Sequence, residues 1–225
     1  MKTYTKKDLD SYMKEDYILD FLNKHESDKG YVSHQWLLDF PPKRMIYADV
    51  YSELFKTKGK RVLDIGGGFS GLTREFLKNH NYTLLDIMAY DDHKKFAVIS
   101  RENKNFWVKD DWMKFEPKGK YDLIIANDLF PNVDQRLILF LEKYKKYSDN
   151  IIVTLTCYDY DRFYTMKRVD ADEILTMRAW DSETTGRALN EFFVKEKIEL
   201  KNQDKSRSLF NNGRIVYKLS LNDYA

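Results

Sequence analysis

Several residue types that mark particular classes of protein are scarce in this sequence. Its single cysteine excludes a disulfide framework and a cysteine-cluster metal site, and favours a reducing, cytoplasmic location. No apolar run approaches the length of a membrane span, and residues 1–8 lack the apolar segment of a signal peptide. Neither sign of charge dominates, because 38 basic and 36 acidic side chains leave a net charge of +2. A nucleic-acid or membrane partner is therefore not expected.

Glycine is scarce as well, but its distribution is informative. The 225 residues include only nine glycines, and four of these fall between residues 66 and 71. Hydrophobic residues make up 43% of the chain and aromatic residues 15%, which is enough to build a core. The sequence therefore predicts one good-sized globular domain in which one short segment needs unusual backbone freedom.

The first quarter of the chain has the pattern of helices. Thr5 and Asp8 have the spacing of a capping box, and apolar residues recur with helical period over residues 9–22. A polar break follows over residues 25–33, and Pro41-Pro42 begin a second helix with an apolar face as far as residue 55. We expect residues 1–58 to form a helical cap or lid, next to a domain that spans residues 59–225.

From residue 60 onwards, short apolar strands alternate with amphipathic helices. Strands are expected at 61–65, 82–85, 106–109, 121–126 and 151–156. Helices are expected after the first strand, after a capping box at Asn132 and Gln135, and at 171–180 and 185–192. Residues 194–200 and 215–221 alternate with period two, which predicts an antiparallel pair. The expected fold class is α/β: a doubly wound, Rossmann-like, seven-stranded and mostly parallel sheet with an antiparallel C-terminal strand.

The glycine-rich segment joins the first of these strands to a helix. Residues 66–71 fit the spacing G-x-G-x-x-G, whose glycines let backbone N–H groups approach a ligand at a helix N-terminus. Asp64 precedes this loop, where its carboxylate would repel a pyrophosphate and attract a cationic amino-acid group. Asp86 ends the second strand and suits two ribose hydroxyls, while residues 110–112 (Asp-Asp-Trp) after the third strand suit an adenine base.

These residues resemble the motifs of the class I S-adenosylmethionine-dependent methyltransferases over residues 59–225. Residues 64–68 are similar to the first motif of that family, Asp86 to its ribose-binding acid, and Asp111, or less closely Asp110, to its adenine-contacting acid. The resemblance implies S-adenosylmethionine as cofactor and S-adenosylhomocysteine as product. The cofactor-binding residues that it implies are Asp64, Gly66, Gly67, Gly68, Asp86, Ile87, Asp110, Asp111, Trp112 and Asn127. An NAD-dependent oxidoreductase remains an alternative, and a magnesium requirement stays open although no metal-ligating residues are predicted.

A second resemblance lies upstream of this domain. The segment Lys24–Gly30, with His34 after it, is similar to the H-G-[ST]-D-K-G segment of some sugar and antibiotic O-methyltransferases, except that Glu26 replaces the glycine. We interpret the segment as a lid that brings His34 to the methyl group and Tyr31 to the substrate. A capped helix end followed by a polar loop is the alternative.

The methyl acceptor is expected at the carboxyl ends of the fourth and fifth strands, because open α/β sheets bind ligands there. Asp128 ends the fourth strand and is the first candidate for a catalytic or acceptor-orienting acid, with His34 as the second. Simple capping of the following helix is the alternative for Asp128. Aromatic and basic side chains follow the fifth strand and suit an acceptor with an anionic group. The predicted substrate-binding residues are Tyr31, Tyr158, Tyr160 and Arg162, with Arg168 as a second candidate for the anion.

We therefore expect an S-adenosylmethionine-dependent O-methyltransferase that acts on a small polar acceptor. A sugar, a nucleotide sugar or a nucleotide-linked phosphate or phosphoramidate from capsule-polysaccharide or secondary-metabolite biosynthesis fits the near-neutral charge. Residues 127–131 lack the N-P-P-[YF] motif of adenine-amino methyltransferases, which argues against DNA as a substrate. A small-molecule N-methyltransferase and a non-catalytic S-adenosylmethionine-binding module remain alternatives, and no oligomeric state is predicted.

Overall fold

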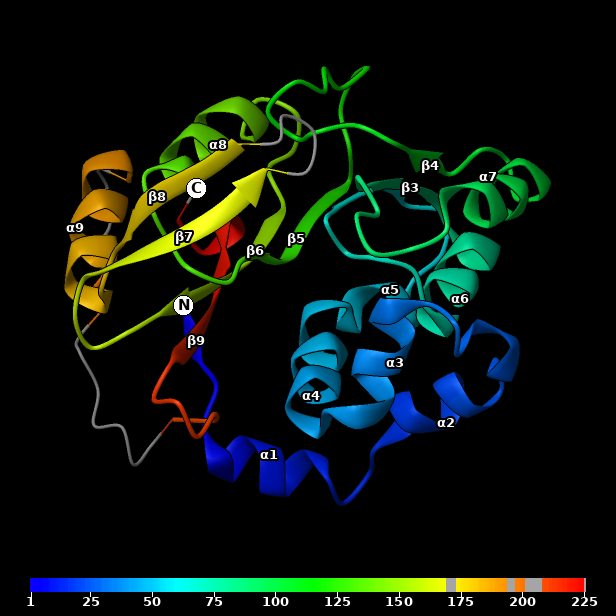
Figure 1. Ribbon diagram of the computed structural model, residues 1–225, viewed down its shortest axis with the longest axis horizontal. Coiled ribbons are helices and arrows are strands. Elements are labelled where there is room, and N and C mark those ends of the chain that lie inside the picture. The colour runs from blue at the N-terminus through cyan, green and yellow to red at the C-terminus, as the bar shows by residue number, and fades with distance from the viewer. Residues whose placement is uncertain (169–172, 194–196, 201–207, 225) are drawn as a thin grey trace.

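The computed structural model describes residues 1–168, 173–193, 197–200 and 208–224, which build a central sheet between two layers of helices (Figure 1). From one edge to the other, the seven strands are β1 (Lys2–Thr3), β9 (Ile215–Ser220), β6 (Ile151–Cys157), β5 (Leu123–Phe130), β2 (Arg61–Ile65), β3 (Asn81–Leu85) and β4 (Trp107–Val108). Neighbouring strands are parallel, except that β9 runs antiparallel to both β6 and β1. The fold class expected from the sequence is confirmed.

The helices in chain order are α1 (Lys6–Tyr12), α2 (Tyr17–Asn23), α3 (Val32–Asp39), α4 (Pro41–Val50), α5 (Ser52–Lys56), α6 (Gly71–Asn79), α7 (His93–Glu102), α8 (Arg136–Tyr144) and α9 (Ser182–Phe192). Two short 3₁₀ turns, η1 (Glu26–Asp28) and η3 (Leu221–Tyr224), and a separate pair of strands, β7 (Arg162–Arg168) and β8 (Glu173–Ala179), complete the described elements. None of the helices in this part of the chain has the length and apolar character needed to span a lipid bilayer.

Successive residues of each central strand point to opposite faces of the sheet, so each face carries its own hydrophobic core. Val62 and Leu84 belong to a core shared with α2 to α7. Leu63 and Leu85 belong to the core on the other face, shared with α8 and α9. The strands β2, β3, β5 and β6 are parallel, so their carboxyl ends meet at one edge of the sheet. Ligands of open α/β sheets bind at this edge.

The N-terminal region is helical, as predicted, but it contains more helices than the sequence pattern indicated. The capping box of Thr5 and Asp8 is confirmed and starts α1. The apolar period then breaks, because Asp16 caps a new helix, α2, and forms an ion pair with the buried Arg44 of α4. Helix α3 begins at the end of the expected polar break and covers residues for which no helix was predicted, since it buries only His34 and Leu37 and so lacks a clear helical period.

Three predictions for the C-terminal half are wrong. The described part of the predicted helix 171–180 is strand β8, because antiparallel pairing with β7 outweighs its helix propensity. The predicted antiparallel pairing of residues 194–200 with 215–221 does not form. Residues 197–200 form no strand, 194–196 lie outside the described residues, and β9 pairs with β6 and β1. The predicted capping box before α8 is also absent: Asp134 accepts from the backbone N–H of Arg136, whereas Asn132 accepts from Arg162.

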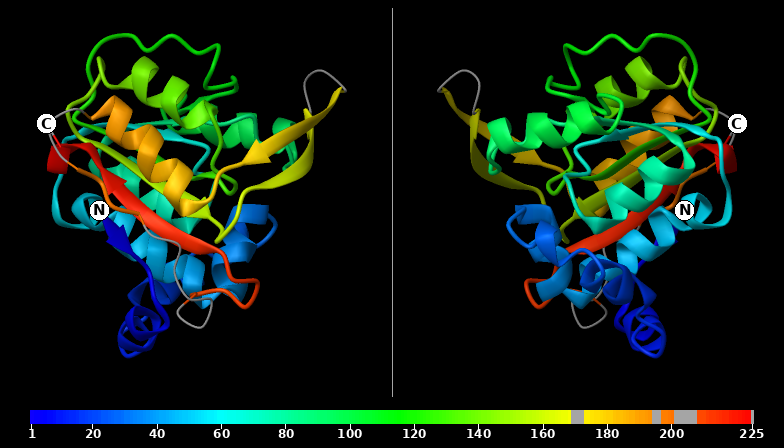
Figure 2. Two further views of the ribbon diagram at one scale, coloured as in Figure 1. Left: turned by 90° about the vertical axis from the view of Figure 1, so that its left-hand side faces the viewer. Right: turned by 90° about the vertical axis from the view of Figure 1, so that its right-hand side faces the viewer.

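The strands β7 and β8 form a hairpin that projects from the body of the molecule (Figure 2). At its base, the Tyr164 hydroxyl donates a hydrogen bond to Asp134 and accepts one from Arg136. The guanidinium of Arg136 is itself paired with Asp134 at 2.6 Å. This network attaches the hairpin to the start of α8.

The cap helices are attached to α6 by an ion pair that is largely shielded from water. Asp28 is 1% exposed, and its two carboxylate oxygens accept from Arg74 Nε and Nη2 at 2.7 and 2.8 Å. The Arg74 guanidinium also lies over the ring of Phe69 in the glycine loop. His25 makes a second contact with the same helix through Glu75 at 3.1 Å. The segment that resembles the sugar methyltransferases thus joins the cap to α6.

We predict that Asp28→Asn lowers the free energy of unfolding by about 2–3 kcal/mol, because it leaves the partly buried Arg74 without a counter-charge. Urea denaturation should measure this change. The matched control is Glu26→Gln in the same turn. Among the described residues the Glu26 side chain forms only an exposed pair with Lys29, so this change should alter stability by less than about 0.5 kcal/mol. Equal effects of the two substitutions would contradict the assignment of Asp28–Arg74 as the attachment.

Candidate active site

The glycine loop between β2 and α6 has a conformation that other residues would not tolerate. Gly66 and Gly68 have φ angles of 71° and 66°, in the left-handed region that favours glycine. A Cβ atom on Gly67 would lie 2.4 Å from a carboxylate oxygen of Asp64, and one on Gly68 would lie 1.9 Å from the Ser33 hydroxyl oxygen. The loop therefore approaches both the end of β2 and the N-terminal cap more closely than side chains allow.

Asp64 is a buried carboxylate at the end of β2, directly beneath this loop. One of its oxygens, Oδ2, accepts hydrogen bonds from the hydroxyls of Tyr82 and, at 2.9 Å, Tyr51. The other, Oδ1, is buried without a hydrogen-bond partner among the described residues. Burial raises the pKa of Asp64 to about 7, against the lowering effect of the two tyrosine hydroxyls. A nearby cation would relieve this cost of burial.

Asp86 follows β3 and faces the glycine loop from the neighbouring strand. Its Oδ2 accepts from the backbone N–H of Gly68 at 3.0 Å, and its Oδ1 accepts from that of Met88 at 2.7 Å. Burial raises the pKa of this carboxyl group. Because a carboxylate offers about four acceptor positions, Asp86 can still accept from two hydroxyl groups of a ligand.

The residues predicted to hold an adenine base lie after β4, and the two aspartates and the tryptophan differ in their surroundings. Asp110 and Asp111 are half-buried, and each accepts a hydrogen bond from a nearby backbone N–H. Trp112 packs edge-on against Phe140 of α8, with ring centroids 5.6 Å apart, so its ring is engaged in the core. Ile87 is 40% exposed, as an apolar side chain available to a ligand would be.

His34 and Tyr31 do lie on the cap, but both face the glycine loop and its helix. The backbone N–H of Gly71, the first residue of α6, donates to His34 Nδ1 at 3.1 Å. His34 is fully buried, and burial lowers the pKa of its imidazole. Tyr31 packs edge-on against Phe69 at a centroid distance of 4.8 Å. In this arrangement His34 positions the start of α6. Neither His34 nor Tyr31 lines the pocket that lies beside Asn127 and Asp128, at the carboxyl ends of β5 and β6.

Asn127 and Asp128 lie at the carboxyl end of β5, as expected, although β5 continues to Phe130. Asp128 has a φ angle of 60° at an irregularity in the pairing of β5 with β6, which turns its side chain toward the cap. Its carboxylate pairs with Lys43 Nζ of α4 at 2.6 Å. The backbone N–H of Asp128 and the side-chain oxygen of Asn127 both bond to the Thr154 hydroxyl of β6.

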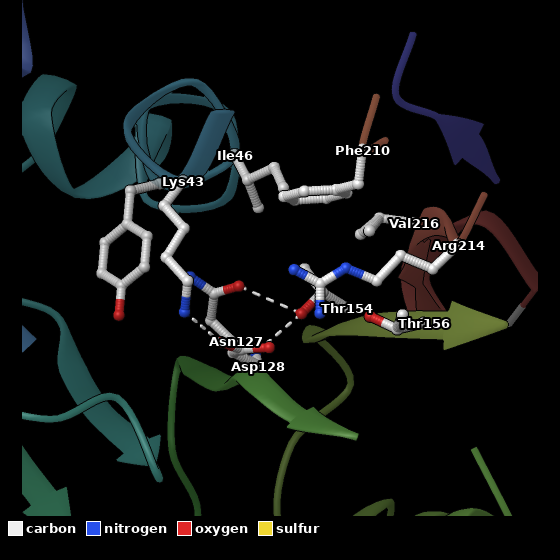
Figure 3. A pocket seen from close by; sticks show the side chains of 10 residues that line it. Lys43, Ile46, Asn127, Asp128, Thr154, Thr156, Phe210, Arg214 and Val216 are labelled. Atoms are coloured by element: carbon white, nitrogen blue, oxygen red, sulfur yellow. Dashed lines mark hydrogen bonds and ion pairs between the residues drawn. The ribbon is translucent and has the colours of Figure 1, made fainter. Parts of the chain in front are cut away.

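A pocket opens beside these residues, between α4, the ends of β5 and β6, and the start of β9 (Figure 3). Its lining is formed by Lys43, Ile46, Tyr47, Asn127, Asp128, Thr154, Thr156, Phe210, Arg214 and Val216. Tyr47 connects the pocket to the glycine loop, because its hydroxyl donates to the Gly67 carbonyl oxygen at 2.9 Å. The sequence pattern did identify Asn127 and Asp128. It missed the pocket residues from α4 and from residues 210–216, although it predicted a helix from Pro41-Pro42 and a strand at 215–221.

The aromatic and basic residues that were predicted to line the acceptor site lie outside this pocket. The Arg162 guanidinium carbon lies 3.7 Å from the ring centroid of Tyr158, and its Nη2 donates to the side-chain oxygen of Asn132. Neither Arg162 nor Tyr158 lines the pocket. Tyr160 is 54% exposed and also lies outside it. The side chain of Arg168 lies outside the described part of the structure.

The residues at this edge of the sheet fit S-adenosylmethionine. Its ammonium group can pair with the free oxygen of Asp64, and its ribose hydroxyls can donate to Asp86. The amide nitrogen Nδ2 of Asn127 is likewise buried without a partner among the described residues, and it can donate to a ligand in the pocket. Within the same part of the chain, no group of three or more His, Cys, Asp or Glu side chains is arranged to hold a metal ion.

Comparison with known proteins relates this chain to solved structures. No family model and no curated protein sequence matches it. The N-terminal domain of EvdMO1, in a crystal structure with S-adenosylhomocysteine and D-fucose present, superimposes with a TM-score of 0.50 at 12% identity, over 78% of this chain and 80% of that one. The 1,6-didemethyltoxoflavin-N1-methyltransferase of Burkholderia thailandensis gives a TM-score of 0.49 at 12% identity, over 98% of this chain and 92% of that one. An S-adenosylmethionine-dependent methyltransferase from Clostridium acetobutylicum gives a TM-score of 0.48 at 16% identity, over 92% of this chain and 98% of that one.

At these low identities the likeness concerns the fold. The strand order, with β9 antiparallel to both of its neighbours, and the likeness to the EvdMO1 domain together show a Rossmann-like fold. The glycine loop and the two acids at strand ends occupy the edge of the sheet where this fold class binds ligands.

We predict that Asp64 makes the ligand-free protein less stable as pH rises. The raised pKa of Asp64 means that between about pH 4 and 7 the folded protein holds a proton that the unfolded chain has lost. Urea denaturation should therefore show that Asp64→Asn, relative to wild type, gains about 2–3 kcal/mol between about pH 5 and about pH 8. The control is Asp39→Asn, a change at an exposed carboxylate bonded to Gln35, which should follow wild type. If the free energy of unfolding depends on pH in the same way for wild type and Asp64→Asn, the prediction is wrong.

Proposed function

We propose that this protein transfers a methyl group from S-adenosylmethionine to an oxygen atom of a small polar acceptor. The observation that carries the proposal is the glycine loop above the buried carboxylate of Asp64, one oxygen of which has no partner among the described residues. This combination suits a cationic amino-acid group and would repel the pyrophosphate of NAD. It therefore supports a methyltransferase over an oxidoreductase.

Bound S-adenosylmethionine supplies a methyl group on a positively charged sulfur, and the broken carbon–sulfur bond leaves its electron pair on S-adenosylhomocysteine. The protein aligns the acceptor oxygen with the methyl carbon and keeps water out. Asp128 lines the pocket and takes the proton of an acceptor hydroxyl as a lone pair of that oxygen forms the new bond. Lys43, in contact with the same carboxylate, holds it in place.

The pocket supports a small acceptor with hydrogen-bonding groups. Its lining combines hydroxyl, amide and charged groups with the aromatic rings of Tyr47 and Phe210. A sugar, a nucleotide sugar or a nucleotide-linked phosphate, methylated in the cytoplasm during capsule-polysaccharide or secondary-metabolite biosynthesis, is the acceptor class that we propose. Screening these acceptors with S-adenosylmethionine, with and without magnesium, and identifying the methylated atom by mass spectrometry would test it. A product methylated on nitrogen would overturn the O-methyltransferase assignment.

Asp86→Ala should weaken the binding of S-adenosylhomocysteine by about tenfold or more, because it removes the acceptor for the ribose hydroxyls. Isothermal titration calorimetry measures this affinity directly and needs no acceptor. Asp39→Ala, which removes a carboxylate on the exposed face of α3, should bind as wild type does. If Asp86→Ala retains wild-type affinity, the cofactor site has been assigned wrongly.

Asp128→Asn should lower kcat by about tenfold or more while the affinity for S-adenosylhomocysteine stays within about twofold of wild type. Asparagine tolerates the left-handed backbone of this position, so the substitution changes the charge and the proton-accepting group rather than the loop. Steady-state rates with an acceptor found in the screen, together with calorimetry, separate the two effects. An unaltered kcat would remove Asp128 from the catalytic residues.

A further inference from the structure

The acceptor pocket carries one positive charge more than its acidic side chains balance. Lys43 and Asp128 are paired at 2.6 Å, so their charges offset each other. Arg214 is the second cation of the lining, and no carboxylate among the described residues pairs with it. Its Nε atom is also buried there without a hydrogen-bond partner. A half-buried guanidinium whose Nε is buried with an unused donor favours an anionic acceptor group.

The Arg214 side chain is held in place before any ligand binds. Its guanidinium lies 4.1 Å from the ring centroid of Phe210, and Figure 3 shows it extending between Phe210 and Thr154 toward Asn127. The backbone of the same residue is fixed as well, since Ser208 Oγ donates to its carbonyl oxygen at 2.6 Å. Stacking on an aromatic ring and a fixed backbone reduce the entropy that Arg214 loses when it binds a ligand.

The donors that remain in the pocket match an oxyanion. A guanidinium offers a planar fork of N–H groups that suits two oxygens of a phosphate or carboxylate. The unpartnered amide nitrogen of Asn127 and the hydroxyl of Thr156 line the same pocket and add donors. The Thr154 hydroxyl contributes less, because it already donates to Asn127 and accepts from the Asp128 backbone.

We propose that Arg214 binds an oxyanion, a phosphate or a carboxylate, on the methyl acceptor. The inference rests on the proposed function, because it assigns the pocket to the acceptor. An oxyanion held at Arg214 leaves the rest of the acceptor facing Asp128 and Tyr47, and Tyr47 contacts the glycine loop. Arg214 is thereby a specificity-determining residue that selects anionic acceptors and orients them toward the methyl group.

Calorimetry on the complete chain saturated with S-adenosylhomocysteine tests this inference. The probes are inorganic phosphate, glucose 1-phosphate, glucuronate and glucose, which separate phosphate, carboxylate and neutral ligands. We expect glucose 1-phosphate or glucuronate to bind at least about tenfold more tightly than glucose. The stronger of the two identifies the oxyanion. Equal binding of charged and neutral sugars, or no binding of any anion, would overturn the inference.

Matched variants assign the effect to one side chain. Arg214→Gln should weaken binding of the anionic probes by about tenfold or more, and Arg214→Lys should restore part of it, since lysine keeps the charge but not the fork. Arg101→Gln removes an exposed arginine of α7 outside the pocket and should bind anions as wild type does. Thermal unfolding of each variant checks that it is folded. Equal losses in Arg214→Gln and Arg101→Gln would overturn the assignment.

Titration of S-adenosylhomocysteine alone distinguishes this inference from the proposed function. If wild type does not bind S-adenosylhomocysteine, the proposed function fails, whatever the anions do. If wild type binds it and Arg214→Gln binds it equally well, a loss of anion binding supports the acceptor assignment. If Arg214→Gln loses affinity for S-adenosylhomocysteine instead, the oxyanion is the carboxylate of the cofactor, and the acceptor assignment is overturned.

Discussion

Burial of the Asp64 carboxylate is the constraint on which the arrangement of the site depends. The carboxylate lies under the glycine loop, so residue 67 has no space for a side chain. The hydroxyls that accompany it come from Tyr82 on β3 and from Tyr51, which ends α4. A single buried charge thus ties together two strands, the loop and a cap helix. Its raised pKa indicates that the ligand-free protein bears an electrostatic cost that a bound cation would offset.

The cap contributes directly to the site. Ser33 fills the space left by Gly68, and His34 accepts the first backbone N–H of α6. Helix α4 supplies both Tyr47, bonded to the loop, and Lys43, bonded to Asp128. The separation into a cap of residues 1–58 and a domain of residues 59–225 stays a prediction, but the cap and the sheet together enclose the pocket.

The near-neutral charge of the chain conceals an unequal local distribution. Asp64 and Asp86 give the glycine-loop side an acidic character, which suits a cationic cofactor. The other side, at β6 and β9, carries Arg214, whose Nε has no hydrogen-bond partner among the described residues. Opposite charges a short way apart along one sheet edge can orient two different ligands, and the overall charge of +2 does not reveal this.

The sequence by itself determined the parts of this protein that depend on neighbouring residues. Strand period, the glycine spacing and the acids at strand ends are local signals, and they located β2, β3, Asp64 and Asp86. Only the tertiary structure decided that residues 173–179 pair with β7, and that Arg214 lines the same pocket as Asn127 because β9 lies beside β6. Such contacts join residues far apart in the chain, and local period and propensity carry no information about them.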